Sequence, residues 1–183
     1  MGIALTWVAA PHLTREACLA RLELAPTGAA GEYLQLPLAV HVLPAGGQLV
    51  TALACGHRIM SDASMAALSA QGEALCCSVE EHVNYACCAL WQDGRRIWQV
   101  EYSAEESEDD IVCEGDVPAR VAALRAETEP GFAMEIPLEL AREHAGFRHD
   151  VLDPAFEAVP FDALRDLHVR PRWWHRLLRP AGR

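Results

Sequence analysis

The sequence predicts an α+β domain with a mainly antiparallel sheet of five to seven strands and three or four helices, packed on one face of the sheet or at its edges. Three observations support this prediction. The chain has 183 residues, of which 51% are hydrophobic, and this is enough for one well-buried core. Short segments rich in β-forming residues alternate with short segments that carry helix-capping residues. The pair Asp93-Gly94 lies between two long apolar runs and is the strongest hairpin signal in the chain.

The first part of the chain is expected to form an apolar strand from Ile3 to Ala9. Thr14 then suits the N-cap of a helix that runs to about Leu24, because its hydroxyl can accept from a free backbone N–H of the first turn. The next residues, "APTGAAGE" (25–32), include Pro and two Gly and predict a loop.

A hairpin with a longer loop is predicted next. Tyr33 to Leu43 alternates in polarity and is rich in β-formers, and a turn then leads into a second strand, Leu49 to Ala54. Ser61 or Asp62 is expected to cap the following helix. Gly72 lies where a left-handed C-cap glycine is expected.

The stretch "LCCSVEEHVNYACC" (75–88) holds four thiols and one imidazole, a composition that suggests zinc. Structural zinc sites, however, use ligand pairs that are separated by two to four residues. On a strand, Cys76 and Cys77 point to opposite faces, and so do Cys87 and Cys88. We therefore interpret these cysteines as small apolar residues inside a sheet, and expect no metal and no other cofactor. Because the run is longer than a usual strand, a bend or break is expected near residues 80–82.

A two-residue type I′ turn at Asp93-Gly94 would place Trp91 opposite Arg96 and Cys87 opposite Val100. One face of this hairpin is strongly apolar and is expected to be buried. Its members are Val83, Tyr85, Cys87, Trp91, Trp98, Val100 and Tyr102.

After this hairpin, an acidic loop begins at Ala104 and leads to a short strand, Ile111 to Cys113. Two helices are expected in "VPARVAALRAE" and "PLELAREHAG", and a third, short helix from Asp162. We expect one acidic domain over residues 1–160 and a basic, aromatic C-terminal segment over residues 161–183 that docks on it.

The net charge of −11 is unevenly distributed. Residues 161–183 hold six arginines and two aspartates, which gives +4, whereas residues 1–160 hold nine arginines and 24 acids, which gives −15. Such an acidic body repels nucleic acid and anionic membranes and attracts a basic partner, although the same charge also serves solubility. The expected contact residues lie in the acidic loop: Glu105, Glu106, Glu108, Asp109 and Asp110.

Two pairs of residues offer an alternative, catalytic interpretation. Cys55 and His57 could act as nucleophile and base, although no third group or oxyanion-binding glycine pattern accompanies them. Glu81 and His82 form the second pair. A buried carboxylate at Glu81 needs a partner or a raised pKa, unless a break in the strand exposes it.

A polar segment with possible ligands follows the last predicted interior helix. The residues "FRHDVLD" (147–153) carry side chains that suit a phosphate or a divalent cation, and a polar loop is the simpler interpretation.

We expect a cytoplasmic, bacterial protein. Its cysteines show no disulfide framework, its N-terminus lacks a signal-peptide pattern, and its basic residues are all arginine. In size, in charge and in its lack of a catalytic motif the chain resembles bacterial immunity proteins, which are small acidic cytosolic inhibitors of a cognate toxin. The leading hypothesis is therefore a non-enzymatic domain that binds a basic protein. A small hydrolase or transferase is the alternative. The third hypothesis is that the arginine- and tryptophan-rich tail contacts nucleic acid or a membrane.

Overall fold

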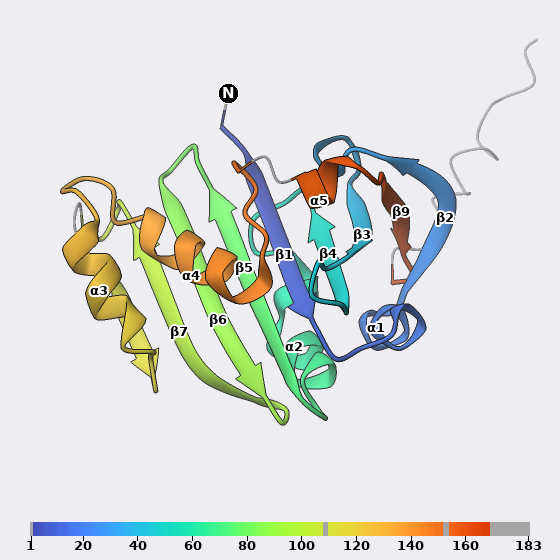
Figure 1. The fold of residues 1–183 in the computed structure, drawn as a ribbon, viewed down its shortest axis with the longest axis horizontal. Helices are drawn as coiled ribbons and strands as arrows, with labels where there is room; N and C mark the ends of the chain where they lie inside the picture. The colour runs from blue at the N-terminus through green and yellow to red at the C-terminus, as the bar shows by residue number, and fades with distance from the viewer. Residues whose placement is uncertain (1, 108–109, 152–153, 169–183) are drawn as a thin grey trace, which may run out of the picture.

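The computed structural model describes residues 2–107, 110–151 and 154–168, and in these residues it contains one sheet of nine strands (Figure 1). The strand order is β2-β9-β3-β4-β1-β5-β6-β7-β8, and every neighbouring pair is antiparallel. The α+β class is confirmed, but the predicted five to seven strands were too few. The strands are β1 (Ala4–Ala10), β2 (Leu24–Gly31), β3 (Leu38–Val42), β4 (Gln48–Ala52), β5 (Glu73–Glu80), β6 (Tyr85–Gln92), β7 (Arg95–Ser103), β8 (Val112–Gly115) and β9 (Phe161–Asp166).

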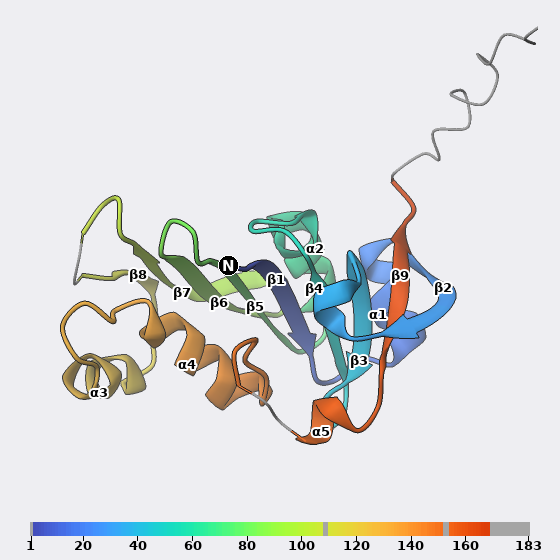
Figure 2. The same ribbon diagram turned by 90° about the horizontal axis from the view of Figure 1, so that it is seen from above.

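The helices cover both faces of the sheet rather than one (Figure 2). The reason lies in β1, where residues 5–10 are all buried, so that neither face of this central strand is left to solvent. One core forms under α1 and α2, and the other under α3, α4 and α5. The helices are α1 (Arg15–Leu22), α2 (Asp62–Leu68), α3 (Arg120–Glu127), α4 (Glu135–Ala145) and the four-residue α5 (Pro154–Glu157), with single 3₁₀ turns η1 (Tyr33–Gln35) and η2 (Arg58–Met60).

Local capping signals in the first half of the chain are mostly confirmed. The Thr14 hydroxyl accepts from the backbone N–H of Ala17 at the start of α1, and the Ser61 hydroxyl accepts from Ser64 at the start of α2. Gly72 is not the C-cap of α2, because that helix already ends at Ser69.

The strands β2 and β9 correct two predictions. Residues 25–32 were expected to be a loop, and Asp162 was expected to begin a helix. Instead the two segments pair with each other, with a register shift between Pro26 and Ala30, and β9 also pairs with β3. Residues 161–166 are thus a strand inside the sheet, directly after the expected boundary at residue 160. Residues 169–183, which include most of the basic tail, lie outside the described residues.

The four-cysteine stretch forms the hairpin β5–β6, with a turn at residues 81–84 where a break was expected. All four thiols are buried, which confirms their place in the sheet. The turn changes which of them share a face. Cys77 lies opposite Cys88 in the core under α4, while Cys76 lies opposite Ala89 in the core under α2.

The hairpin β6–β7 turns at Asp93-Gly94 as predicted, with φ of 50° and 77°, and Trp91 pairs with Arg96. A bulge then shifts the register by one residue, so that Cys88 rather than Cys87 lies opposite Val100. The predicted single apolar face is therefore wrong. Trp91 belongs to the core under α1 and α2, the other core takes Trp98, Val100 and Tyr102, and Val83 is exposed in the 81–84 turn.

Within the described residues, no helix is long and apolar enough to cross a membrane.

Candidate functional site

The predicted contact residues lie at one end of the sheet, in the loop that joins β7 to the edge strand β8 (Figures 1 and 2). Glu105, Glu106 and Asp110 are exposed in this loop, whereas Glu108 and Asp109 lie outside the described residues. All four residues of β8 are exposed as well. We call this region the acidic end. It comprises the β7–β8 loop, β8 and the turn between α3 and α4.

A hollow of about 190 Å³ opens in the acidic end. Three carboxylates line it, from Glu101 on β7 and from Glu106 and Asp110 in the loop. One molecule of liquid water occupies about 30 Å³, so the hollow has room for the charged end of one basic side chain. The cavity therefore presents negative charge to anything that enters it.

Only part of this negative charge is balanced. Arg125 donates to the Asp110 carboxylate at 2.8 Å and to the Ile111 carbonyl at 2.9 Å, and so fastens the loop to α3. Glu114 on β8 is 2.8 Å from Arg96. Among the described residues no basic side chain pairs with Glu105 or Glu106. These two glutamates leave the loop with a net negative charge.

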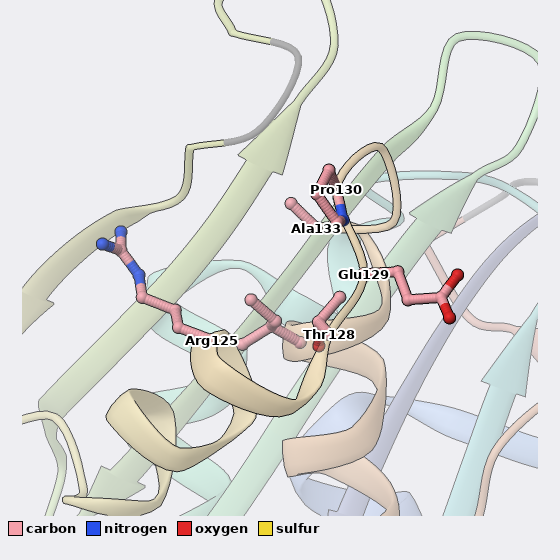
Figure 3. Close-up of a pocket in the computed structure, with 6 residues that line it drawn as sticks. Arg125, Thr128, Glu129, Pro130 and Ala133 are labelled. Carbon is pink, nitrogen blue, oxygen red and sulfur yellow. The ribbon is translucent and has the colours of Figure 1, made fainter.

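A second hollow, of about 260 Å³, lies beside the α3–α4 turn. In Figure 3 the Arg125 side chain extends from α3 toward the β7–β8 segment, while the Glu129 carboxylate points away from it. Ala133 and Ile136 form the apolar wall of this hollow. Phe132 in the same turn and Val112 on β8 are exposed apolar side chains. The acidic end thus combines charge with apolar surface, and the sequence did not indicate the contribution of α3 and its turn.

The structure does not join Cys55 and His57 as nucleophile and base. The Cys55 sulfur lies 3.3 Å from the Ser78 hydroxyl, and His57 Nδ1 accepts from the backbone N–H of Ile59. Burial, together with the neighbouring Arg58 charge, lowers the pKa of His57.

The backbone around Cys55 does not form an oxyanion hole either. The N–H of Gly56 donates to Ser78 Oγ, and the N–H of His57 donates to Thr6 Oγ1. The two hydroxyls lie 3.0 Å apart, and Thr6 also donates to the Ala54 carbonyl at 2.7 Å. The amides that would stabilise a developing oxyanion are therefore turned inward, where they hold the loop against the sheet.

Glu81 and His82 are also separated. The His82 imidazole lies 2.6 Å from Glu80, whereas Glu81 accepts from His149 Nε2 at 3.0 Å and from the Ile3 backbone N–H at 2.9 Å. The strand break leaves the Glu81 side chain 30% exposed. Partial burial acts to raise the pKa of Glu81, but the hydrogen bonds from His149 and Ile3 outweigh it, and the net pKa is lowered. Glu81 is thus an ionised partner of His149.

The polar segment at residues 147–153 is held together internally. Arg148 contacts both oxygens of Asp150, at 2.6 and 2.7 Å, and also Glu135 at 2.5 Å. Burial acts to raise the pKa of Asp150, but the Arg148 guanidinium lowers it overall. Asp153 lies outside the described residues. Arg148, the arginine expected to suit a phosphate, is therefore occupied by carboxylates.

The buried thiols are poor nucleophiles. Burial raises the pKa of Cys18 to about 12, and it raises the pKa of Cys76, Cys77 and Cys87 as well. A thiol acts as a nucleophile or a metal ligand only as the thiolate. Within the described residues, no three side chains of His, Cys, Asp or Glu are grouped so that they could hold a metal ion.

No family model, curated protein or solved structure matches this chain, so the acidic end must be judged on its own geometry.

Proposed function

We propose that this chain is a protein-binding domain that engages a basic protein through its acidic end. The observation that carries this proposal is the acid-lined hollow beside an exposed edge strand. A lysine or arginine of the partner would enter the hollow between Glu101, Glu106 and Asp110. The charge of the loop would speed the encounter and select basic surfaces.

Apolar contacts beside the hollow would supply the affinity. Binding energy at protein interfaces is concentrated in a few large side chains that become fully desolvated. Phe132 and Val112 are exposed at the acidic end and are placed to act in this way. Among the described residues no strand pairs with the outer edge of β8, so this edge would offer its main-chain N–H and C=O groups to an extended segment of the partner.

An immunity-type role is the specific form of this proposal. An inhibitor that covers a toxin needs a rigid surface and charge opposite to that of its target, and it needs no catalytic groups of its own. The acidic end has this character, since Arg125 fastens its loop to α3 while Glu105 and Glu106 keep their charge. In this form, the partner is a basic toxin, and the domain would protect the cell that makes both.

The test is recovery of a partner from the native host with tagged protein. The informative variant is Glu105→Gln with Glu106→Gln, because neither side chain holds the fold together through an ion pair. Glu16→Gln with Asp62→Asn is the matched control, since it removes the same charge from exposed acids elsewhere on the surface. We expect the loop variant alone to lose a basic partner, and added salt to slow its association. Equal binding by both variants would contradict the proposal.

A genetic test addresses the immunity-type role. The product of the neighbouring gene is expressed in a sensitive cell, with and without this chain. Rescue of growth by the wild-type chain and by the control variant, but not by the loop variant, is the expected result. A neighbour that is harmless on its own would contradict this form of the proposal, while protein binding in general would still be tested by partner recovery.

A further inference from the structure

A larger hollow, of about 600 Å³, lies far from the acidic end, on the half of the molecule that holds β9 and α5 (Figure 1). Tyr33 of η1, Phe156 of α5 and Phe161 of β9 line it together with His149 and Asp150, which follow α4. Small-molecule sites in proteins have volumes of about 300–1,000 Å³. The size of this hollow therefore suits a small organic ligand.

Three aromatic rings, those of Tyr33, Phe156 and Phe161, form part of its wall. The Phe161 ring centroid lies 5.3 Å from that of Tyr33 and 6.2 Å from that of Phe156. Phe147 supports both outer rings from behind, at 5.5 Å from Tyr33 and 5.1 Å from Phe156. Tyr33 is fixed further because its hydroxyl donates to the His149 carbonyl at 2.5 Å. A wall of mutually packed rings suits a flat apolar or aromatic group.

A buried polar atom without a partner lies in the same wall. The His149 side chain is only 1% exposed, and its Nε2 lies 3.0 Å from the ionised Glu81 carboxylate. Because a carboxylate only accepts, Nε2 carries the proton of this hydrogen bond. Among the described residues Nδ1 has no hydrogen-bond partner, since the nearest Asp150 oxygen is 3.9 Å away, which is too far for a hydrogen bond.

The charge of the hollow favours cations over anions. Glu32 and Asp150 both line it, and none of its described lining residues is an arginine. Arg148 pairs with Asp150 but also with Glu135, so the carboxylates around the hollow outnumber this one guanidinium. A ligand that brings a positive charge and N–H donors would be attracted to the Asp150 carboxylate. A protonated amine brings both, and it also interacts favourably with the faces of the surrounding rings.

We infer that this hollow is a binding site for a small aromatic amine, with its ring between Tyr33, Phe156 and Phe161 and its ammonium group beside Asp150. This site goes beyond the proposed protein-binding function and uses none of the residues of the acidic end. Each proposal can therefore fail without the other.

The experiment compares three probes that share one ring and differ in their polar group: phenethylamine, 2-phenylethanol and phenylacetate. Binding to the full chain is measured by calorimetry, and the site is located by backbone amide shifts in ¹⁵N-labelled protein. We expect phenethylamine to bind at least about tenfold tighter than phenylacetate, with the alcohol between them. The shifts should gather at residues 31–34 and 149–150.

Two variants with a matched control separate the ring wall from the charge. Phe156→Ala should weaken all three probes, and Asp150→Asn should weaken the amine alone. Phe132→Ala removes an equally large but exposed ring from the acidic end, outside the hollow, and should leave the affinities for all three probes unchanged. Phenylacetate binding as tightly as phenethylamine would overturn the inference. So would a lack of saturable binding by any probe, or an equal effect of Phe132→Ala and Phe156→Ala. The probe comparison needs only the wild-type chain, so it decides the matter even if a variant fails to fold.

Discussion

The two buried hydroxyls that hold the loop at Cys55 allow a quantitative test of the structure. Thr6 is fully buried; its hydroxyl accepts from the His57 N–H at 3.1 Å and donates to the Ala54 carbonyl at 2.7 Å. Thr6→Val keeps the shape of the side chain and leaves both backbone groups without this partner. A buried polar group that loses its partner costs about 1–3 kcal/mol. The His57 N–H and the Ala54 carbonyl both lose a partner, but the carbonyl lies near the surface and can bond to water instead. We therefore expect the free energy of unfolding to fall by about 2–3 kcal/mol, less than twice the largest single cost.

Ser78→Ala is expected to cost less. Ser78 Oγ accepts from the Gly56 N–H at 2.9 Å, but Gly56 is itself exposed, so its N–H can turn to solvent. We expect a loss of about 1–2 kcal/mol. The double variant should lose less than the sum of the two single variants, because each removes the same contact between the hydroxyls at 3.0 Å.

Thr51→Val is the matched control. Thr51 is equally buried, on the neighbouring strand β4, but within the part of the chain that the structure describes its hydroxyl has no hydrogen-bond partner. Removal of an unpaired buried hydroxyl should leave the free energy of unfolding unchanged or raise it. The assay is urea unfolding, combined with the rate at which the Cys55 thiol reacts in the native state. A loss for Thr51→Val as large as that for Thr6→Val would refute the reasoning. So would a Cys55 thiol that reacts at the wild-type rate in both Thr6→Val and Ser78→Ala.

Three further predictions follow from the same structure. With a thiol reagent, native protein should react at Cys55 and Cys113 and should expose its five buried cysteines only on unfolding; fast reaction at Cys76, Cys77, Cys87 or Cys88 would show that the sheet is not as described. Glu81→Gln should lower the free energy of unfolding by about 1 kcal/mol at neutral pH. Because the pKa of Glu81 is lowered in the folded state, this difference should be complete above its ordinary pKa of 4.5 and should vanish as the pH falls through the folded value; a difference independent of pH would exclude a hydrogen bond from His149 to the ionised carboxylate. In the β3–β4 turn, Gly46→Ala should cost about 1–2 kcal/mol from its positive φ alone. Gly47→Ala should cost clearly more in the same unfolding assay, because its new methyl would lie 2.3 Å from the Pro11 backbone. Equal losses would show that the backbone of the turn moves away from Pro11 to make room for the methyl.

Those parts of the fold that depend on local chemistry could be predicted from the sequence. Positive φ at two adjacent residues suits Asp-Gly, so the hairpin at Asp93 followed directly. Thr14 and Ser61 cap their helices through hydroxyls that bond to N–H groups three residues ahead. The burial of the cysteines followed from the opposite directions of neighbouring side chains on a strand.

What could not be predicted depends on contacts between distant parts of the chain. The strand β2 has no alternation of its own and forms by pairing with β9, which is more than 130 residues away. The bulge after Trp91 is not visible in composition, yet it exchanges the face of every residue beyond it. Glu81 was recognised as a carboxylate in need of a partner, but its partner, His149, lies 68 residues along the chain. The hollow in the acidic end was missed for a different reason. Its lining residues all lie between residues 101 and 112, but their side chains come together only when the loop folds back on β7.

The acidic end is the surface that we propose to meet a partner, and site-specific crosslinking in living cells of the native host tests this role most directly. A photoreactive side chain is placed at Glu106, and in a separate variant at Ala29, which is exposed on β2 at the opposite edge of the sheet. We predict a crosslinked product with a basic protein from position 106 and none from position 29. Crosslinking from position 29 with none from position 106 would contradict the account.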